Sequence, residues 1–505
     1  MKNNTIIVIG GGLAGLAAGC YALLNGYDCT VVEQHHEAGG LAATWTRGDY
    51  IIDGGLLHLT GTQPGLAAYD LYRQLGILPR LRLIEPPVLL RVFDESLDRS
   101  LDVGRNLDRL AFELKTLSPS DEELINDIAF GSKHIGLIDV QTAEMPFELM
   151  GARQKLRRSW SMRSTLRFFT GFYAQPVADI LGKLEDQFVR NVLLGLTFPQ
   201  APLWHLMLNL SLFSRGQMAL LPEGSISLVR LLEERYLSLG GILQTGTRVA
   251  GVKTLPLAGG EYEARGVELE SGEALEADYL IGALDTHVMT HDLLGGDFLD
   301  QPTLARFRDW QLHQPLVMVS LGINRLFSEL PPHNLLLLRR PFFVGDKTVD
   351  RLHLRLFNYC PSFAPAGKTV VQAWFESDWA YWSTLAQTDR SAYEAEKERM
   401  AREVIRRLEY HFPGVVRKVE MTDVATPYTT WRATGNFQGS YRGWLPTPRV
   451  AVATVPRTLP GLQHFVTAGH WTVPGGGAPA TLLSGRHAVQ LVCRRDGRPF
   501  TSGAS

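Results

Sequence analysis

The stretch that decides the fold is Thr5-Ile6-Ile7-Val8-Ile9-Gly10-Gly11-Gly12-Leu13-Ala14-Gly15, which continues into a small-residue run over 16–24. The near-continuous apolar run before the glycines is typical of a parallel strand covered on both faces. The glycines predict a tight turn and the run after them a helix. A turn at Asn25-Gly26 then leads to Cys29-Thr30-Val31-Val32, a second predicted strand that ends at Glu33. This order predicts a dinucleotide-binding fold of the Rossmann type.

Each glycine of the first turn has a physical role. Gly10 permits the tight strand-to-helix turn, Gly12 lets the backbone approach a pyrophosphate, and Gly15 allows close packing of helix on strand. The first residues of the helix, Leu13 and Ala14, would offer free N–H groups to the phosphates.

The acidic residue after the second strand completes the expected site. Glu33 is placed to accept hydrogen bonds from an adenosine ribose, and Gln34 beside it is expected in the same site. The alternative is a glycine-rich turn without a ligand. Strand, helix and acidic residue all fall where a ligand requires them, so we predict a nucleotide site.

The next segments resemble the flavoproteins that share the glutathione-reductase-type FAD fold. Gly39-Gly40-Leu41 match a second glycine pair that approaches the pyrophosphate and ribitol, and Asp53-Gly54-Gly55 match the turn under the flavin, with His58 close behind. Many relatives carry arginine where this chain has Leu41, so backbone or another residue must supply that pyrophosphate contact. Because an NAD dehydrogenase has no need of the second element, the resemblance implies FAD.

The same resemblance implies that two distant segments complete the FAD domain. The first contains a predicted helix over 226–239, strands at 242–244 and 280–283, and a hairpin around Ser271-Gly272. Backbone at Val249 is expected to contact the adenine. The second is a strand, glycine turn and helix over 465–492, with cofactor contacts implied at Gly469, His470, Gly476, Gly477 and Ala478. A helix N-terminus there would stabilise negative charge on the reduced flavin.

These assignments predict an α/β protein in which a Rossmann-like FAD-binding domain is interleaved with an α+β substrate-binding domain. We expect the FAD-binding domain at 1–90, 215–290 and 455–505. The substrate domain is then expected at 91–214 and 291–454.

Three segments narrow the resemblance to the phytoene desaturases and carotenoid isomerases: residues 469–479, residues 53–61, and Gly439-Ser440 with Gly443-Trp444. That resemblance implies desaturation or isomerisation of a long apolar, polyisoprenoid or carotenoid-like substrate by hydride transfer at flavin N5. His470 and Trp471 replace smaller residues of some desaturases, which leaves the substrate open. The alternatives are a polyene saturase or amine oxidase of the same fold, or a non-catalytic prenyl or lipid carrier related to the Rab GDP-dissociation inhibitors.

The sequence assigns no catalytic acid or base. His58 and His470 lie in segments expected to border the isoalloxazine, where a histidine either moves a proton or only forms hydrogen bonds. Glu376 and Asp378 are expected on an exposed rim of the pocket. The histidines show no metal-ligand spacing, so we expect no metal.

Composition excludes several functional classes. The chain has 505 residues and a formal net charge of −2, without the strongly basic domain that nucleic-acid binding calls for. It contains no uninterrupted apolar stretch long enough to span a membrane and no apparent secretory leader, so we expect a cytoplasmic protein. Its four scattered cysteines are expected to be buried free thiols.

Residues 151–173 interleave basic with apolar and aromatic side chains. Cationic amphipathic segments of this kind lie well at a membrane interface, which would make the protein peripheral to a membrane. An ordinary helix whose apolar stripe meets the core has the same pattern. Both interpretations stay open at this point.

Overall fold

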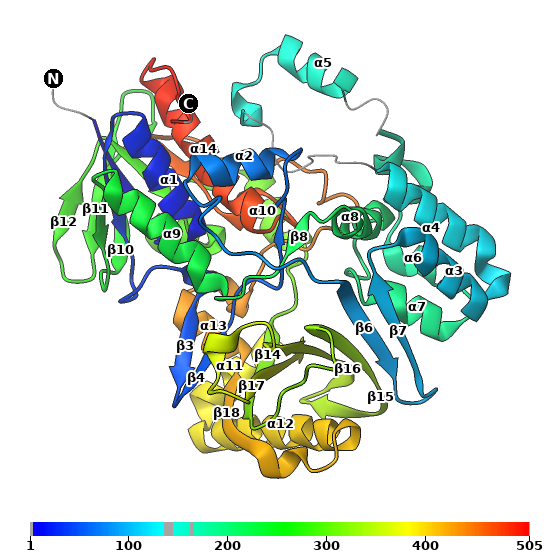
Figure 1. Cartoon of the computed structure of the whole chain (residues 1–505). Coiled ribbons are helices and arrows are strands. Elements are labelled where there is room, and N and C mark those ends of the chain that lie inside the picture. The colour runs from blue at the N-terminus through cyan, green and yellow to red at the C-terminus, as the bar shows by residue number, and fades with distance from the viewer. Residues whose placement is uncertain (1–3, 136–144, 162–165, 504–505) are drawn as a thin grey trace.

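The computed structural model describes residues 4–135, 145–161 and 166–503, and its first layer is the predicted nucleotide-binding sheet (Figure 1). In this part of the chain the sheet has five parallel strands in the order β20-β13-β1-β2-β9, with bounds Phe465–Thr467, Tyr279–Gly282, Thr5–Ile9, Asp28–Val32 and Ile242–Gln244. Three segments far apart in the sequence thus supply one sheet. The predicted α/β class and the buried parallel strand at its centre are confirmed.

The central strand β1 is buried on both faces, as its apolar run requires. Ile6 and Val8 face a helical layer, whereas Ile7 and Ile9 face a layer of antiparallel strands. The helices are α1 (Leu13–Leu24), α9 (Ser225–Ser238) and α14 (Ala478–Arg495). The antiparallel strands are β10 (Val249–Pro256), β11 (Tyr262–Leu269) and β12 (Ala274–Glu276), with β19 (Leu462–Gln463) beside β11. Alternate side chains of β1 therefore pack the parallel sheet against the helices on one face and against the antiparallel strands on the other.

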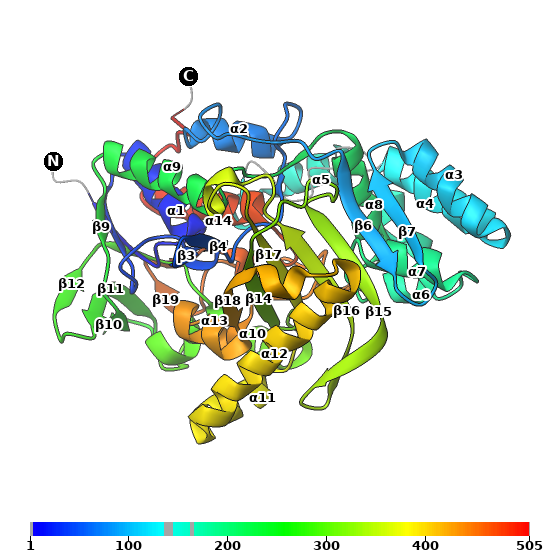
Figure 2. The same cartoon turned by 60° about the horizontal axis from the view of Figure 1, so that its bottom comes forward.

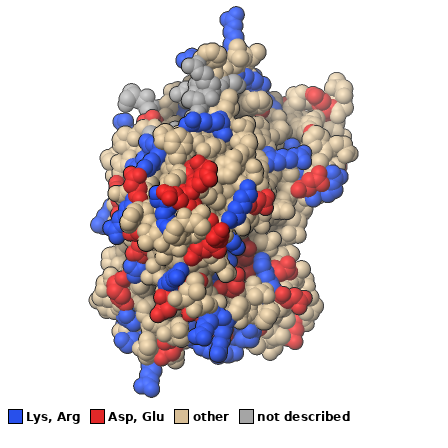
Figure 3. All heavy atoms as spheres, turned by 90° about the vertical axis from the view of Figure 1, so that its right-hand side faces the viewer, with Lys and Arg blue, Asp and Glu red and all other residues tan. Residues whose placement is uncertain are grey.

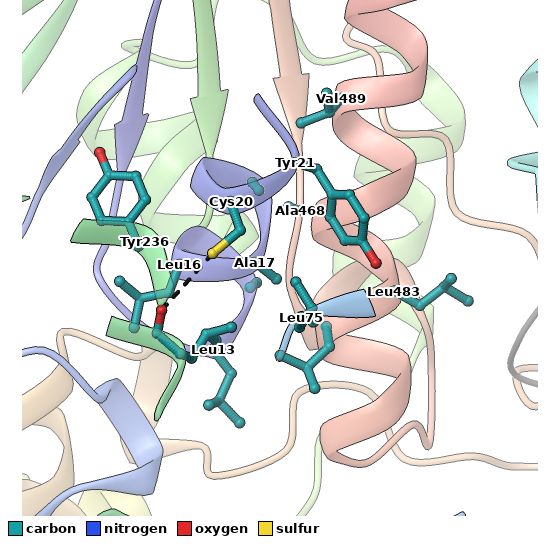
Figure 4. Close-up of a cluster of buried hydrophobic side chains, with 14 of the residues drawn as sticks. Leu13, Leu16, Ala17, Cys20, Tyr21, Leu75, Tyr236, Ala468, Leu483 and Val489 are labelled. Carbon is teal, nitrogen blue, oxygen red and sulfur yellow. Dashed lines mark hydrogen bonds between the residues drawn. The ribbon is translucent and has the colours of Figure 1, made fainter. Parts of the chain in front are cut away.

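Small side chains on α1 let the helical layer close tightly. Figure 4 shows Ala17 and Cys20 of α1 between Tyr236 of α9 and Leu483 of α14. The Tyr236 hydroxyl donates to the Cys29 carbonyl at 2.7 Å, which links α9 to β2 beneath α1. All four cysteines are buried and free, as predicted.

A larger sheet forms the second half of the molecule, and in the described residues it has seven strands. Their order is β18-β14-β17-β16-β15-β6-β7, with bounds Val419–Ala425, Leu316–Ile323, Thr369–Glu376, Lys347–Leu356, His333–Val344, Val88–Asp94 and Arg99–Gly104. Figure 2 shows α11 (Trp379–Thr388) and α12 (Arg390–His411) beside this sheet, where they share an apolar core with it.

Helices cover the β6–β7 end of that sheet and build a further apolar core. They are α3 (Leu107–Leu117), α4 (Glu122–His134), α6 (Val177–Leu181), α7 (Gln187–Leu194) and α8 (Leu203–Ser214). Shorter elements are α2 (Ala67–Gln74), which packs in the core of the parallel-sheet half, α10 (Gln301–Asp309), α13 (Pro427–Thr434), the hairpin β3–β4 (Thr44–Arg47, Tyr50–Asp53) and the pair β5–β8 (Leu59–Thr60, Met218–Ala219). Among the described residues, no helix is both long enough and apolar enough to cross a bilayer.

Helix α5 (Ala152–Ser161) stands apart from the rest of the molecule at the top of Figure 1. It belongs to the segment 151–173, which divides into two parts. Leu156 and Trp160 of α5 are 70% and 67% exposed, so this part of the apolar stripe does not meet the core. Phe168, in contrast, is fully buried, and Phe169, Phe172 and Tyr173 pack beside it. Residues 162–165 of the segment lie outside the described residues.

Candidate active site and cofactor cavity

A cavity of about 1890 Å³ is lined by both halves of the molecule. Its wall includes the following predicted cofactor residues: Gly10, Gly12, Leu13, Ala14, Glu33, Gln34, Gly39, Gly40, Leu41, Gly54, Gly55, His58, Val249, Gly469, His470, Gly476, Gly477 and Ala478. Gly15 is not part of this wall. A Cβ at Gly15 would overlap the Gly10 carbonyl oxygen, so this glycine serves the contact between helix and strand. The structure thus gathers the predicted residues in one place, and their contacts with FAD stay predictions.

Two helices begin at this cavity without side-chain caps. α1 starts after Gly12 and α14 after Gly477, and neither N-terminus carries a capping side chain or an acidic residue in its first turn. The first N–H groups of a helix lack partners within the helix and attract anions. A Cβ at Gly12 would meet no atom within 4 Å, so the backbone there is open to the cavity. These features fit the pyrophosphate of a dinucleotide.

The second glycine pair lies directly against the first glycine turn. Gly39 forms a parallel bridge with Gly12, and its N–H donates to the Gly11 carbonyl at 3.0 Å. Gly39 and Gly40 have φ angles of 142° and 55°, which residues with a Cβ rarely adopt. Leu41 follows them in the cavity wall and has an uncharged side chain, so a phosphate bound beside it would depend on backbone groups.

Glu33 is buried in the cavity wall, where the sequence predicts the adenosine ribose. Its Oε2 accepts from the Gly11 N–H at 2.7 Å and its Oε1 from the His35 N–H at 2.9 Å. These bonds fix the carboxylate against the glycine turn, where each oxygen keeps a second lone pair for a ribose hydroxyl.

A buried ion pair holds the turn at Asp53 below the cavity. The Asp53 carboxylate accepts from the N–H groups of Gly55 at 2.8 Å and Ser225 at 2.9 Å. The Arg355 guanidinium lies 3.6 Å from it, and the two side chains are 0% and 1% exposed. Buried charges require this degree of pairing. The pair therefore fixes the Gly54–Gly55 backbone on the larger sheet.

Both histidines singled out in the sequence are neutral at pH 7. Burial, and secondly the charge of Arg355, lowers the pKa of His58 to about 3. Burial, and secondly the charge of Arg442, lowers the pKa of His470 to about 4. Of the two roles expected for them, hydrogen bonding fits better than proton donation near neutral pH.

Asp285 is the carboxyl group of the cavity that titrates near neutrality. Burial raises its pKa to about 7, although the N–H groups of Phe437, Val288 and His287 donate to it and oppose the rise. It follows the buried strand β13 and lines the cavity. A group of this pKa can hold or release a proton at physiological pH. We missed Asp285 in the sequence, where its place just after a buried parallel strand was the available signal.

Sequence reasoning also missed the polar residues of β16. Arg351, His353 and Arg355 line the cavity, and they alternate with Leu352 and Leu354 along the strand. Alternation of polar and apolar residues places one set on one face of a sheet. That pattern was readable in the sequence and would have indicated a polar surface inside the molecule. Glu376 and Asp378 lie in the cavity wall with exposed side chains, as expected for a rim.

A family model described as flavin-containing amine oxidoreductase matches residues 13–493. The chain belongs to this family. It is therefore an FAD-dependent oxidoreductase. A cavity at which two helices begin without caps fits the phosphates of that cofactor.

Relatives and solved structures agree with that membership. The chain is 23% identical to a phytoene desaturase (lycopene-forming) of Paracoccus sp., over 97% of each chain. It is 24% identical to prolycopene isomerase 1 of an Oncidium hybrid cultivar, over 95% of this chain and 82% of that one. An oxidoreductase from Methanosarcina mazei has a TM-score of 0.59 at 14% identity, over 96% of this chain and 100% of that one. Cyclohexylamine oxidase from Brevibacterium oxydans has a TM-score of 0.57 at 14% identity, over 98% and 100%. At these identities the structures show the fold alone.

FAD would supply the exchange of a hydride or of single electrons with a substrate if it binds in this cavity. The chain supplies the rest. The open helix ends and glycine backbone would bind the phosphates, Glu33 would hold the ribose, and Asp285 holds a proton near pH 7. In the described part of the chain, no three His, Cys, Asp or Glu side chains converge on a metal site.

Proposed function

We propose that this FAD-dependent oxidoreductase desaturates or isomerises a long apolar, polyisoprenoid or carotenoid-like substrate. The size and lining of the cavity carry the proposal. Pockets for drug-sized ligands measure about 300–1,000 Å³, whereas this cavity measures about 1890 Å³. It continues from the predicted FAD residues to apolar side chains of the second half: Leu89, Leu90, Leu194, Leu208, Leu212, Met218, Leu316 and Met318. That room suits a dinucleotide together with a long apolar molecule.

The substrate part of the cavity combines flat rings with uncharged imidazoles. His353 stacks on Trp374 with ring centroids 3.9 Å apart and an interplanar angle of 3°, and both residues line the cavity. Burial, and secondly the charge of Arg351, lowers the pKa of His353 to about 3, so the ring is neutral at pH 7. Stacked, uncharged rings can contact a conjugated chain without the cost of burying a charge. The names of the two relatives, a phytoene desaturase and a prolycopene isomerase, support the same substrate class.

Turnover with defined polyenes tests this proposal. Purified protein should show a flavin spectrum. With phytoene and a quinone as electron acceptor in lecithin vesicles, or with prolycopene after anaerobic reduction of the flavin by dithionite, it should give a desaturated or isomerised product by chromatography. Leu208→Trp fills part of the apolar wall, so we expect it to slow turnover while the flavin spectrum stays unchanged. Flavin reduction by putrescine or cyclohexylamine, with neither polyene converted, would favour an amine oxidase and contradict the proposal.

We also propose that α5 contacts a membrane surface. The proposed contact is thus limited to the first part of the segment 151–173. The described basic residues Arg153, Lys155 and Arg157 are exposed on this helix together with Leu156. α5 stands at the top of Figure 3, where basic side chains project beyond the mixed charges of the body. A short helix with basic and apolar side chains can lie in the interface of an anionic bilayer.

Charge reversal tests the membrane contact. A basic residue near an anionic surface contributes about 1 kcal/mol to binding, so Arg153→Glu, Lys155→Glu and Arg157→Glu together should weaken vesicle binding by at least about 100-fold. Co-sedimentation with phosphatidylglycerol vesicles measures this effect. The matched control reverses Arg390, Arg402 and Arg406 of α12 and gives the same net charge. Equal binding by the two triple variants would contradict the contact.

A further inference from the structure

One region of the cavity wall gathers an arginine and three histidines from different elements. His205 lies on α8, His313 precedes β14, His470 lies in a short 3-10 helix (His470–Thr472), and Arg442 lies in the loop after α13. All four line the cavity. The Arg442 charge lowers the pKa of each of the three histidines, although burial is the larger cause in every case. The Phe198 ring joins three of them, since it lies 5.6 Å from the Arg442 guanidinium, 4.5 Å from the His313 ring and 6.2 Å from the His205 ring.

Arg442 has no acidic partner in the part of the chain that the structure describes. Two other cavity arginines have one: Arg351 lies 3.0 Å from Asp350, and Arg355 lies 3.6 Å from Asp53. The Arg442 guanidinium instead lies 5.6 Å from the centre of the Phe198 ring and 5.8 Å from that of Tyr441. The rings restrict its position and leave its donors available to a ligand.

The histidines around Arg442 also indicate that a polar ligand group binds here. His313 is 2% exposed, and its Nε2 is buried with no hydrogen-bond partner. A buried ring nitrogen without a partner is costly, and a bound ligand would remove that cost. His205 is held in place, since its Nδ1 lies 2.9 Å from the Thr197 hydroxyl. The Nε2 of His470 also lacks a partner, but we expect that residue to contact FAD.

We propose that Arg442, with His205 and His313 beside it, binds a carboxylate of the substrate. This inference rests on the proposed function, to which it adds that the apolar substrate carries an acidic end. The planar guanidinium can donate two parallel hydrogen bonds to one carboxylate, and a buried imidazole can donate a third. Arg442 is itself exposed, so water can reach its guanidinium, but a hydrocarbon without polar groups would leave the buried His313 nitrogen without a partner.

Matched retinoids test this proposal. All-trans-retinoate and all-trans-retinol share one apolar chain and differ at the acidic end, so the ratio of their affinities reports on the carboxylate alone. Quenching of tryptophan fluorescence measures binding to the FAD-loaded protein, because Trp310, Trp374, Trp379 and Trp431 line the cavity. The wild type should bind retinoate at least about tenfold more tightly, as expected for hydrogen bonds to a charged group.

Arg442→Gln should bring the affinity ratio close to one, and Arg442→Lys should keep part of the preference. Arg351→Gln removes a cavity arginine that is already paired with Asp350, and it should leave the ratio unchanged. Equal affinities in the wild type, or an unchanged ratio in Arg442→Gln, would overturn the inference. Loss of FAD by Arg442→Gln with an unchanged ratio would assign this arginine to the cofactor and overturn it too. A preserved ratio without conversion of any polyene, with or without a terminal carboxylate, would refute only the proposed function.

Discussion

Gly12→Ala adds a single methyl group where α1 begins. The new Cβ would meet no atom within 4 Å, and Gly12 has φ −75° and ψ −176°, which alanine adopts without strain. Alanine caps a helix less well than glycine, at a cost of up to about 1 kcal/mol. We therefore expect the flavin-free variant to unfold with a free energy within about 1 kcal/mol of the wild type.

The same methyl group would enter the cavity beside the open N-terminus of α1. If the FAD pyrophosphate binds there, the methyl group separates it from the helix N–H groups. Each hydrogen bond to a charged group contributes about 1.5–3 kcal/mol, so losing one should weaken FAD binding roughly 10- to 150-fold. Affinity for FAD and stability of the flavin-free chain should thus respond very differently to one substitution.

Two measurements check this expectation: titration of flavin-free protein with FAD, followed by flavin fluorescence, and urea unfolding without FAD. Gly15→Ala is the matched control, because its Cβ would overlap the Gly10 carbonyl oxygen. Overpacking of this kind should lower the free energy of unfolding by about 1–3 kcal/mol even without cofactor. Wild-type FAD affinity in Gly12→Ala would refute the placement of the pyrophosphate at α1.

Three further predictions concern stability, each measured by urea unfolding. Because the pKa of His58 and of His353 is lowered to about 3, only the unfolded chain takes up their protons below pH 6.5. The free energy of unfolding should then fall between pH 6.5 and 5, by up to about 1.4 kcal/mol per pH unit for each; a slope unchanged in His353→Phe would contradict this. Arg355→Met leaves the Asp53 charge buried without its partner and should cost about 3–5 kcal/mol. Adding Asp53→Asn should restore part of that loss, and purely additive effects would argue against the pair. Tyr236→Phe removes the bond to the Cys29 carbonyl and should cost about 1–3 kcal/mol; an unchanged midpoint would show that this bond contributes nothing.

The half of the molecule that contains the five-stranded parallel sheet was predictable from the sequence because its signals are local. A buried strand, a glycine turn and a helix follow one another within a few residues at both ends of the chain, and each forms where it was predicted. The helix expected over 226–239 is observed at Ser225–Ser238, and the hairpin at Ser271-Gly272 joins β11 to β12. The domain boundaries stay predictions.

For the other half of the molecule, the sequence predicted only the α+β class and not the residues of the site. That site forms through contacts between residues far apart in the sequence. His205, His313 and Arg442 come from a helix and two loops that are far apart in the sequence. None of these three residues belongs to a sequence motif that indicates a site. They come together only because α8 and the two loops pack around one cavity. Sequence periodicity does not predict which distant residues lie close together in space.

The arrangement of the parallel sheet has a consequence for synthesis of the protein. β1 is made first, yet it lies between β2 and β13, and β13 in turn pairs with β20 near the C-terminus. Pairing between distant segments is slow, and exposed strand edges favour aggregation during the delay. α14, whose N-terminus lines the cavity, leaves the ribosome last of all the helices described. One edge of β1 therefore stays unpaired until residues 279–282 have been translated, and the part of the cavity wall that α14 forms is completed only after residue 478 has been made.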